Sequence, residues 1–318
     1  MQNKAFHRLL SQLKKLTPTQ TKQLQNHIKQ KCSIKTIEEV TGFADNCPHC
    51  GSTIFYKWGV RSGIQRYKCI ACNKTFNTLT KTPLARLRHK EVWKKYAQDL
   101  INGITIEKSA EHCKVANRTS FRWRHRMLEA SQDVKAKKLH GIVELDETHF
   151  LKSEKGNHNL DREPHKRGGW AKQGQYTPVL IARDRNGNMT DAVLRNSQDG
   201  TISEVMLELL DRRDVLLCSD SKSSYRSFAL MFDFEHETIN AGKEHTRGIY
   251  HVQNVNAYGS RLKRWLVRFH GVSTKYLDSY LGWMRIIDTQ KGLTADDLLR
   301  LIARHREEKK IFPPLTRI

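Results

Sequence analysis

Apolar and polar residues alternate with two different periods along the second half of this chain. Short apolar runs predict strands, and longer segments with apolar residues three or four positions apart predict helices. The predicted strands cover residues 141–150, 176–183, 189–194, 215–218 and 234–239, and the predicted helices cover residues 201–212, 224–232 and 254–270. Asn186-Gly187, between the second and third strands, favours a tight hairpin turn. The pattern predicts an α/β domain with a mixed sheet.

The order of these elements is three strands, helix, strand, helix, strand, helix. That is the order of an RNase H-like fold, in which helices flank a mixed sheet. We expect this domain to cover residues 139–290, and residues 291–318 to form a C-terminal helix and tail.

Helical patterns lie on both sides of a cysteine-containing segment in the first half of the chain. Residues 1–40 predict a helical hairpin, because Thr17-Pro18 is typical of a new helix start. Residues 88–132 predict three helices, of which the last two, at 105–113 and 119–130, resemble a helix-turn-helix. The segment is therefore a candidate for DNA binding, although an ordinary helical hairpin has the same pattern.

The last of these helices carries the residues that we expect to meet DNA. Arg122, Arg124 and Arg126 are predicted to be exposed, and Phe121 and Trp123 are predicted to pack inward.

Four of the seven cysteines form two CxxC pairs, Cys47 with Cys50 and Cys69 with Cys72, with 18 residues between the pairs. The residues between them have strand composition. Two such pairs supply four thiolates to one tetrahedral ion and stabilise a core too small to fold alone. We predict a structural zinc ribbon over residues 45–80. Two unrelated thiol pairs would leave the spacing unexplained.

Lys and Arg exceed Asp and Glu by 56 to 33, a net charge of +23. Such an excess predicts a polyanionic partner, nucleic acid first of all. No apolar run approaches the length of a membrane span, and the N-terminus lacks the features of a signal peptide. We therefore expect a cytoplasmic protein, associated with the nucleoid, that has no membrane partner.

Two acids follow apolar runs of the predicted α/β domain. Asp146 is expected to end the first strand and Asp220 to lie just past the fourth. A carboxylate at the end of a core strand is desolvated, so it must be capped, paired or bound to a cation. Asp146 and Glu147 opening a simple turn is the alternative. Farther along, Asn256 and Lys263 are seven residues apart and fall on one side of the predicted helix, away from its apolar stripe.

The segments ELDET around Asp146, LLCSD ending at Asp220, and HVQNVNAYGSRLKRW resemble the insertion-sequence DDE transposases, the ISXO type in particular. These proteins join a zinc ribbon, a helical DNA-binding segment and an RNase H-like core. By this resemblance Asp146 and Asp220 are the first two acids, Asn256 takes the position of the third acid, and Lys263 is the basic residue that follows it. Asn at that position departs from the DDE pattern.

The resemblance implies a transposase that binds the ends of an insertion sequence, cleaves DNA and transfers the strand. It implies double-stranded DNA partners, both element terminal repeats and target DNA, and a homo-oligomer on DNA. Asp146, Asp220 and Asn256 would hold catalytic Mg²⁺ or Mn²⁺ ions, and Lys263 would bind a DNA phosphate.

Two alternatives stay open. A sequence-specific DNA-binding protein with a decayed catalytic domain would show no metal-dependent cleavage. An RNase H-like nuclease without strand transfer would have no use for an end-recognition module.

Overall fold

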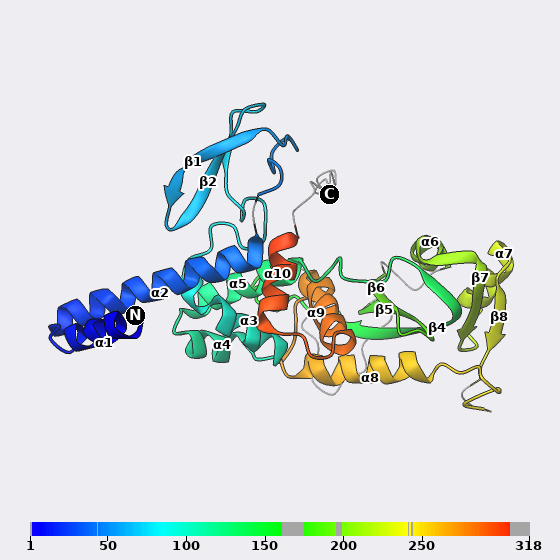
Figure 1. Ribbon diagram of the computed structural model, residues 1–318. Helices are drawn as coiled ribbons and strands as arrows, with labels where there is room; N and C mark the ends of the chain where they lie inside the picture. Colours follow the sequence, from blue (N-terminus) through cyan, green and yellow to red (C-terminus); the bar gives the residue numbers. More distant parts are fainter. Residues whose placement is uncertain are drawn as a thin grey trace. The chain divides into compact units, whose positions relative to one another are not determined.

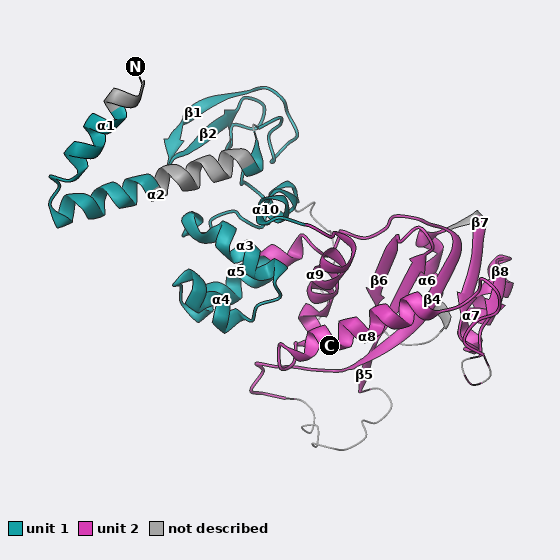
Figure 2. Ribbon diagram, turned by 60° about the horizontal axis from the view of Figure 1, so that its bottom comes forward, with its two compact units in different colours: residues 1–126, 293–318 teal, residues 127–292 magenta. Residues whose placement is uncertain are grey.

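The computed structural model describes residues 2–42, 44–160, 175–194, 199–240, 242 and 244–305. The chain divides into two compact units, one of residues 1–126 with 293–318 and one of residues 127–292 (Figure 2). Among the described residues, no helix is long and apolar enough to cross a membrane.

The second unit is built on a five-stranded sheet (Figure 1). Its strands are β4 (Leu139–Leu151), β5 (Tyr176–Asp184), β6 (Met189–Val193), β7 (Leu210–Ser219) and β8 (Glu235–Thr238). The spatial order is β6-β5-β4-β7-β8. Strands β4, β5 and β6 pair antiparallel, whereas β4, β7 and β8 pair parallel. This mixed sheet with flanking helices is the RNase H-like arrangement that the element order predicts.

One face of the sheet packs on α6 (Asp199–Leu209) and α7 (Ser223–Phe232). Val143 and Leu145 of β4 point to this face and lie in a fully buried apolar cluster with residues of both helices. The central strand is therefore held in place by burial of its odd-numbered residues, and its even-numbered residues face the other side.

The opposite face packs on α8 (Gln253–Val267), and α9 (Leu277–Thr289) packs beside α8. A Cβ added to Gly259 would lie 3.5 Å from Ile181 Cδ1, so α8 crosses close to β5. The Tyr258 hydroxyl donates a hydrogen bond of 2.8 Å to Asp191 on β6. Buried Arg285 on α9 forms an ion pair with the same carboxylate.

Along the chain, the first unit has helices before and after a small three-stranded sheet. The helices are α1 (Gln2–Leu13), α2 (Pro18–Thr41), η1 (Lys90–Val92), α3 (Trp93–Ile101), α4 (Ile106–Cys113), α5 (Asn117–Glu129) and α10 (Ala295–Arg304), the last turn of α5 belonging to the second unit. The sheet has the order β1 (Phe55–Arg61), β2 (Ile64–Cys69), β3 (Thr75–Phe76). In the second unit, a short 3-10 helix, η2 (Thr274–Tyr276), precedes α9.

One strand is longer than expected. Asp146 does not end β4, because the strand continues to Leu151 along its antiparallel partner β5. The pairing with the parallel partner β7 does end there, at Leu145 opposite Ser219. Asp146 thus lies where one neighbouring strand stops and the other goes on, and the alternative that it opens a turn is wrong.

Candidate active site

Asp146 and Asp220 are brought together by two neighbouring parallel strands. Leu145 on β4 is opposite Ser219 on β7, so the two aspartates are the next residue on each strand path. Neighbouring strands lie about 4.8 Å apart, which places two carboxylates beside each other at this end of the sheet.

Charged neighbours and burial both change the pKa of the Asp146 carboxyl. Burial raises the pKa of the Asp146 carboxyl to about 6, although the backbone N–H of Glu147 opposes this rise. The negative charges of Asp220 and Glu147 raise the pKa of Asp146 further, and the positive charge of Lys263 lowers it. Lys263 and Asp220 therefore lie close enough to Asp146 to affect the pKa of its carboxyl.

Local hydrogen bonds hold the segment of Asp220. The Lys222 backbone N–H donates to Asp220 Oδ1 at 3.1 Å, and the Ser219 hydroxyl donates to the Asp220 carbonyl at 2.9 Å. Ser219 Oγ also contacts His236 Nε2 on the next strand at 2.8 Å. These contacts fix the segment that carries the Asp220 carboxylate.

Helix α8 carries the other two predicted residues. Asn256 and Lys263 are both exposed, and seven residues correspond to a separation of about 20° around the helix axis. Both flank Gly259, which faces Ile181, and Ile181 is the cross-strand neighbour of Asp146. This side of α8 therefore borders the aspartates.

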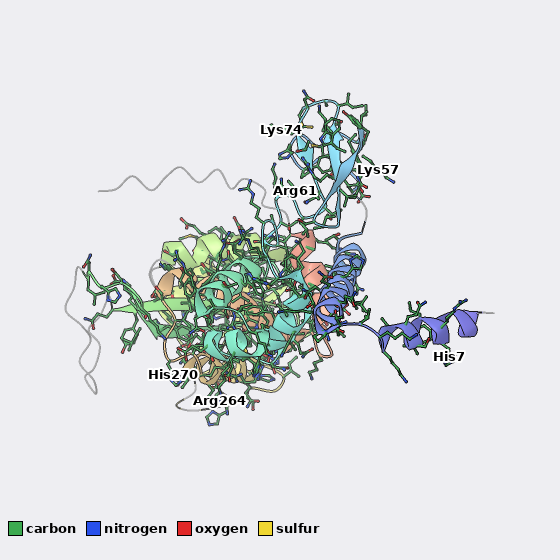
Figure 3. All side chains as sticks on the ribbon, turned by 90° about the vertical axis from the view of Figure 1, so that its left-hand side faces the viewer. His7, Lys57, Arg61, Lys74, Arg264 and His270 are labelled. Atoms are coloured by element: carbon green, nitrogen blue, oxygen red, sulfur yellow. The ribbon has the colours of Figure 1, made fainter. Side chains whose placement is uncertain are left out.

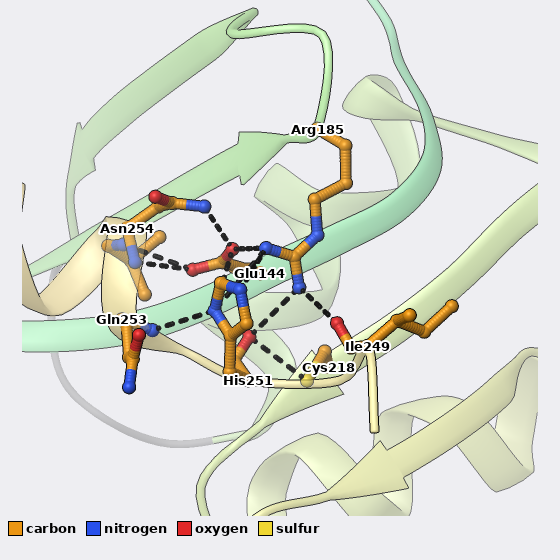
Figure 4. A network of polar contacts seen from close by, with 8 residues as sticks. Glu144, Arg185, Cys218, Ile249, His251, Gln253 and Asn254 are labelled. Carbon is orange, nitrogen blue, oxygen red and sulfur yellow. Dashed lines mark hydrogen bonds and ion pairs between the residues drawn. The ribbon is translucent and has the colours of Figure 1, made fainter. Parts of the chain in front are cut away.

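Glu144 anchors the first turn of α8 to the central strand (Figure 4). Its fully buried carboxylate accepts hydrogen bonds from the Asn254 N–H at 2.8 Å, the Val255 N–H at 3.2 Å and Asn254 Nδ2 at 2.6 Å. Backbone N–H groups at a helix start have no partner within the helix, so a carboxylate there satisfies and stabilises them. Glu144 forms this structural cap.

The same carboxylate binds a cation from the β5–β6 hairpin. Arg185 Nη1 lies 2.6 Å from Glu144 Oε1 and donates to His251 Nε2 at 2.7 Å, and Arg185 Nη2 donates to the Ile249 carbonyl at 3.0 Å (Figure 4). Arg is always protonated, so His251 Nε2 is the acceptor. The Cys218 thiol donates to the His251 carbonyl at 3.3 Å, which ties the segment before α8 to β7. These contacts give His251 and Asn254 a structural role at the start of α8.

Sequence reasoning missed an acid that links the two segments carrying the aspartates. Glu147 follows Asp146 on the strand and points to the opposite face, where Lys222 Nζ forms an ion pair with it and the Tyr225 hydroxyl donates to Oε1 at 3.3 Å. Lys222 lies two residues after Asp220, so this contact links the two segments that carry the aspartates. The signal in the sequence was an acid one residue after Asp146 and a lysine two residues after Asp220, and it could not be recognised without the strand register.

The four paired cysteines gather at one end of the small sheet. The Sγ atoms all lie within 4.8 Å of one another in the cluster of Cys47, Cys50, Cys69 and Cys72. Cys47 Sγ is 3.7 Å from Cys72 Sγ, and Cys50 Sγ is 3.6 Å from Cys69 Sγ. Zn–S bonds of about 2.3 Å in a tetrahedron separate the sulfurs by roughly 3.8 Å, so the cluster fits a metal ion.

The two cysteine turns repeat one backbone design. The residue after each second cysteine, Gly51 or Asn73, has positive φ, +79° and +57° respectively. Gly and Asn are the residues that adopt this conformation most readily. Cys47 N–H donates to the Ser52 carbonyl at 2.8 Å and Cys69 N–H donates to the Lys74 carbonyl at 3.0 Å, which closes both turns.

The three arginines of α5 have different surroundings. Arg122 is exposed, as predicted. Arg126 is half-buried and donates to the carbonyls of Ala85 and Thr82 at 3.3 and 3.2 Å. Arg124 is fully buried, and its Nη2 donates to the Ile104 carbonyl at 2.8 Å and to Ser109 Oγ at 3.3 Å.

The predicted exposure of Arg124 and burial of Phe121 are both wrong. The α4 segment covers the Arg124 side of α5, and the long side chain reaches the Ile104 carbonyl and the Ser109 hydroxyl there. Phe121 is 43% exposed. Arg124 therefore supports the helices and does not face a ligand, whereas Trp123 is buried as predicted and packs edge-on against Tyr96, with ring centroids 5.2 Å apart.

Comparison of the sequence with known proteins finds two related descriptions. Residues 138–285 match the family described as the ISXO2-like transposase domain. An "Uncharacterized protein in transposable element ISH50" of Halobacterium salinarum is 28% identical over 247 residues, which cover 74% of this chain and 82% of that protein.

Comparison with solved structures matches a chain of the simian T-cell lymphotropic virus intasome in complex with the PP2A regulatory subunit B56 gamma, and the Mos1 transposase. The intasome chain has a TM-score of 0.30 and 10% identity, over 59% of this chain and 67% of that one. The pre-cleavage Mos1 transpososome has a TM-score of 0.24 and 14% identity, over 66% of this chain and 79% of that one. The sequence matches, and not these scores, indicate which family the chain resembles.

Proposed function

We propose that this chain is an insertion-sequence transposase and that Asp146, Asp220, Asn256 and Lys263 form its DNA cleavage and strand-transfer site. The match of residues 138–285 to the ISXO2-like transposase domain supports this proposal. The observation that carries this proposal is the position of Asp146 and Asp220, which directly follow Leu145 and Ser219, the last parallel pair between β4 and β7. Two acids on adjacent core strands, with Lys263 acting on the same carboxyl, have no structural purpose that is evident in the fold.

The donor atoms fit divalent cations of the hard type. Two carboxylates and the amide oxygen of Asn256 are oxygen ligands, which Mg²⁺ and Mn²⁺ prefer. A burial that raises the pKa of Asp146 marks a carboxylate for which ionisation is costly without a cation. Bound Mg²⁺ or Mn²⁺ would supply Lewis-acid activation of the attacking oxygen and charge stabilisation at the phosphate.

Each residue of the proposed site has its own role. Asp146, whose pKa is affected by both Asp220 and Lys263, would be the ligand shared by the metal ions. Asp220 and Asn256 would supply further ligand oxygens, and Lys263 would bind a phosphate oxygen of the DNA. Glu144 fixes the helix that carries Asn256 and Lys263, and Glu147 with Lys222 fixes the two acidic segments against each other.

We propose that the first unit recognises the terminal repeats of the element as double-stranded DNA. Arg122 on α5 is exposed, and the four cysteines hold a structural zinc ion that closes the ribbon. A protein that cleaves both ends of an element and joins them to target DNA works as a homo-oligomer on DNA, and we propose that state for this chain.

The cleavage proposal is tested with purified full-length protein, Mg²⁺ or Mn²⁺, and a labelled duplex that ends in the element's terminal repeats. Asp146→Asn should abolish strand cleavage and leave end binding intact, because it removes a ligand charge and no basic residue. Asn256→Ala should lower cleavage strongly, and Asn256→Glu should retain activity. Asp233→Asn is the matched control, since Asp233 is an exposed acid in a left-handed conformation that Asn also accepts.

Unchanged cleavage in Asn256→Ala would show that Asn256 is no ligand. Cleavage retained by Asp146→Asn at wild-type rate would overturn the proposed site as a whole.

The zinc proposal has its own measurement. Metal analysis after extensive dialysis should return about one zinc per chain. Cys47→Ser with Cys69→Ser takes one thiolate from each turn and should lose it, whereas Cys113→Ser, a buried cysteine of α4 outside the cluster, should keep it. Full zinc retention by the double variant would contradict the assignment.

A further inference from the structure

The small sheet of the first unit has one face that is not used for its core. Phe55, Tyr67 and Phe76 pack together on the inner face, with Cys69 beside them. Tyr56 is opposite Lys68 in the β1–β2 pairing and Thr75 is opposite Lys68 in the β2–β3 pairing, so these residues point to the other face. We call Tyr56, Trp58, Arg66 and Lys68 the ribbon outer face.

The ribbon outer face combines aromatic rings with cations at contact distance. The rings of Tyr56 and Trp58 meet edge to face, with centroids 5.7 Å apart. Lys68 Nζ lies 4.7 Å from the Trp58 ring centroid, and Arg66 Nη2 donates to Thr75 Oγ1 at 3.2 Å on the same face.

These rings remain open to solvent. Tyr56 is 44% and Trp58 is 45% exposed, and six of the seven residues of β1 are exposed. Soluble proteins seldom place two neighbouring large aromatic rings on an open face without a partner for them. Tyr56 and Trp58 therefore contribute little to the buried core, and we look for their role in binding a ligand.

The charge around this face selects the kind of partner. The segment from Ser52 to Phe76 contains five basic residues and no Asp or Glu. Lys57, Arg61 and Lys74 project from the ribbon into solvent (Figure 3). A surface with this charge attracts phosphates and repels cationic surfaces, among them the rest of a chain that carries +23.

From this we infer that the ribbon outer face binds unpaired DNA bases, with Tyr56 and Trp58 stacking on the bases and Arg66 and Lys68 binding the phosphates. Flat rings gain stacking contacts only from bases whose faces are free, and a closed duplex presents edges and phosphates instead. The inference rests on the proposed function, because cleavage and transfer expose unpaired strand at an element end. The ribbon then holds the freed strand as well as closing a zinc site.

The test measures binding of the full-length protein to a fluorescein-labelled oligothymidylate and to a blunt duplex of the same length, without added Mg²⁺. Tyr56→Ala with Trp58→Ala should weaken oligothymidylate binding by about tenfold or more, as expected for loss of base stacking, and should change duplex binding far less. Trp58→Phe keeps a ring and should retain most of the affinity. Ile70→Ala, an exposed apolar residue outside the ribbon outer face, is the control and should match wild type.

A second pair of variants separates stacking from charge. Arg66→Gln with Lys68→Gln should weaken binding to both probes and reduce its salt dependence, because both bind phosphates. Zinc content is measured for every variant, and if the aromatic double variant loses zinc, Trp58→Ala alone is compared with Trp58→Phe at full zinc loading.

Three outcomes would overturn the inference. All three concern the aromatic variants. The first is unchanged affinity for oligothymidylate, and the second is an equal loss of affinity for oligothymidylate and for duplex. The third is a loss of self-association in sedimentation with unchanged DNA binding, which would make the face a contact between chains. None of these depends on catalysis. A wild-type protein that binds oligothymidylate through this face and cleaves no element end would count against the proposed function alone.

Discussion

Asp146 carries its charge at a place where the fold disfavours it. Burial raises the pKa of its carboxyl from 3.8 to about 6, and the neighbouring acids Asp220 and Glu147 act in the same direction. A folded-state pKa above the unfolded value means that the native protein binds the proton more tightly. Ionised Asp146 therefore costs stability, and this cost is absent below pH 3.8 and complete once the pH exceeds about 6.

Asp146→Asn should for that reason raise the free energy of unfolding at pH 8 by about 1–3 kcal/mol in protein without added Mg²⁺ or Mn²⁺. At pH 4 the two proteins should have nearly equal stability, because wild-type Asp146 is then protonated in the fold. Urea unfolding of both proteins across this pH range gives the comparison. A difference that is the same at pH 4 and pH 8 would mean that the charge of Asp146 is not the cause.

The predictability of single residues from the sequence depended on whether local pattern or packing decided their place. Asp146 and Asp220 follow apolar runs, and strand register alone brings them together. Arg124 was misplaced, because composition predicts that Arg is exposed, whereas α5 packs on two sides and a long side chain can satisfy itself on buried carbonyls. No periodicity shows that second contact.

At the scale of elements, the sequence predicted the strands of the sheet and the helices that flank it. It did not predict the contacts that fix these helices on the sheet. The predicted helix at residues 254–270 corresponds to α8, but its attachment to β4 depends on Glu144, an acid 110 residues earlier in the chain. Such a cap is invisible to any local pattern. It matters for function because Asn256 and Lys263 reach the site only if α8 keeps its place.

Glu144→Gln tests this positioning role. The amide oxygen can still accept from the Asn254 N–H, but the charge that pairs with Arg185 is lost, so α8 should stay folded and become less firmly held. We expect DNA binding within about twofold of wild type and a several-fold higher Mg²⁺ concentration for half-maximal cleavage. Glu144→Ala leaves Arg185 unpaired and should destabilise the protein by about 3 kcal/mol or more.

Glu235→Gln is the matched control, because Glu235 is an exposed acid on the edge strand β8. An unchanged Mg²⁺ requirement in Glu144→Gln, with reduced stability, would reduce Glu144 to a purely structural cap. Equal shifts in both variants would point to an effect of net charge alone.

At the scale of the whole molecule, the end of the chain returns to its beginning. The sequence predicted a C-terminal helix after the α/β domain, and α10 is that helix, but it packs on α2 and α3 of the first unit. Its start is fixed by a capping box between Thr294 and Asp297, and Lys94 on α3 lies 2.6 Å from Asp296. A contact between segments 200 residues apart could not be inferred from the periodicity of either one.

The last helix should therefore govern the stability of the first unit. Leu299 is 1% exposed on the apolar side of α10, and Leu299→Ala should destabilise that unit by about 2–4 kcal/mol through lost burial and a cavity. Hydrogen exchange followed by mass spectrometry should show loss of protection in α3 and no change in β4, since β4 has its core in the other unit. Arg300→Ala on the same helix removes only a surface ion pair and should leave α3 protected. Full protection of α3 in Leu299→Ala would mean that α10 is a passive addition to the unit, whereas lost protection together with salt-sensitive loss of duplex binding would show that the C-terminal helix supports the DNA-binding unit.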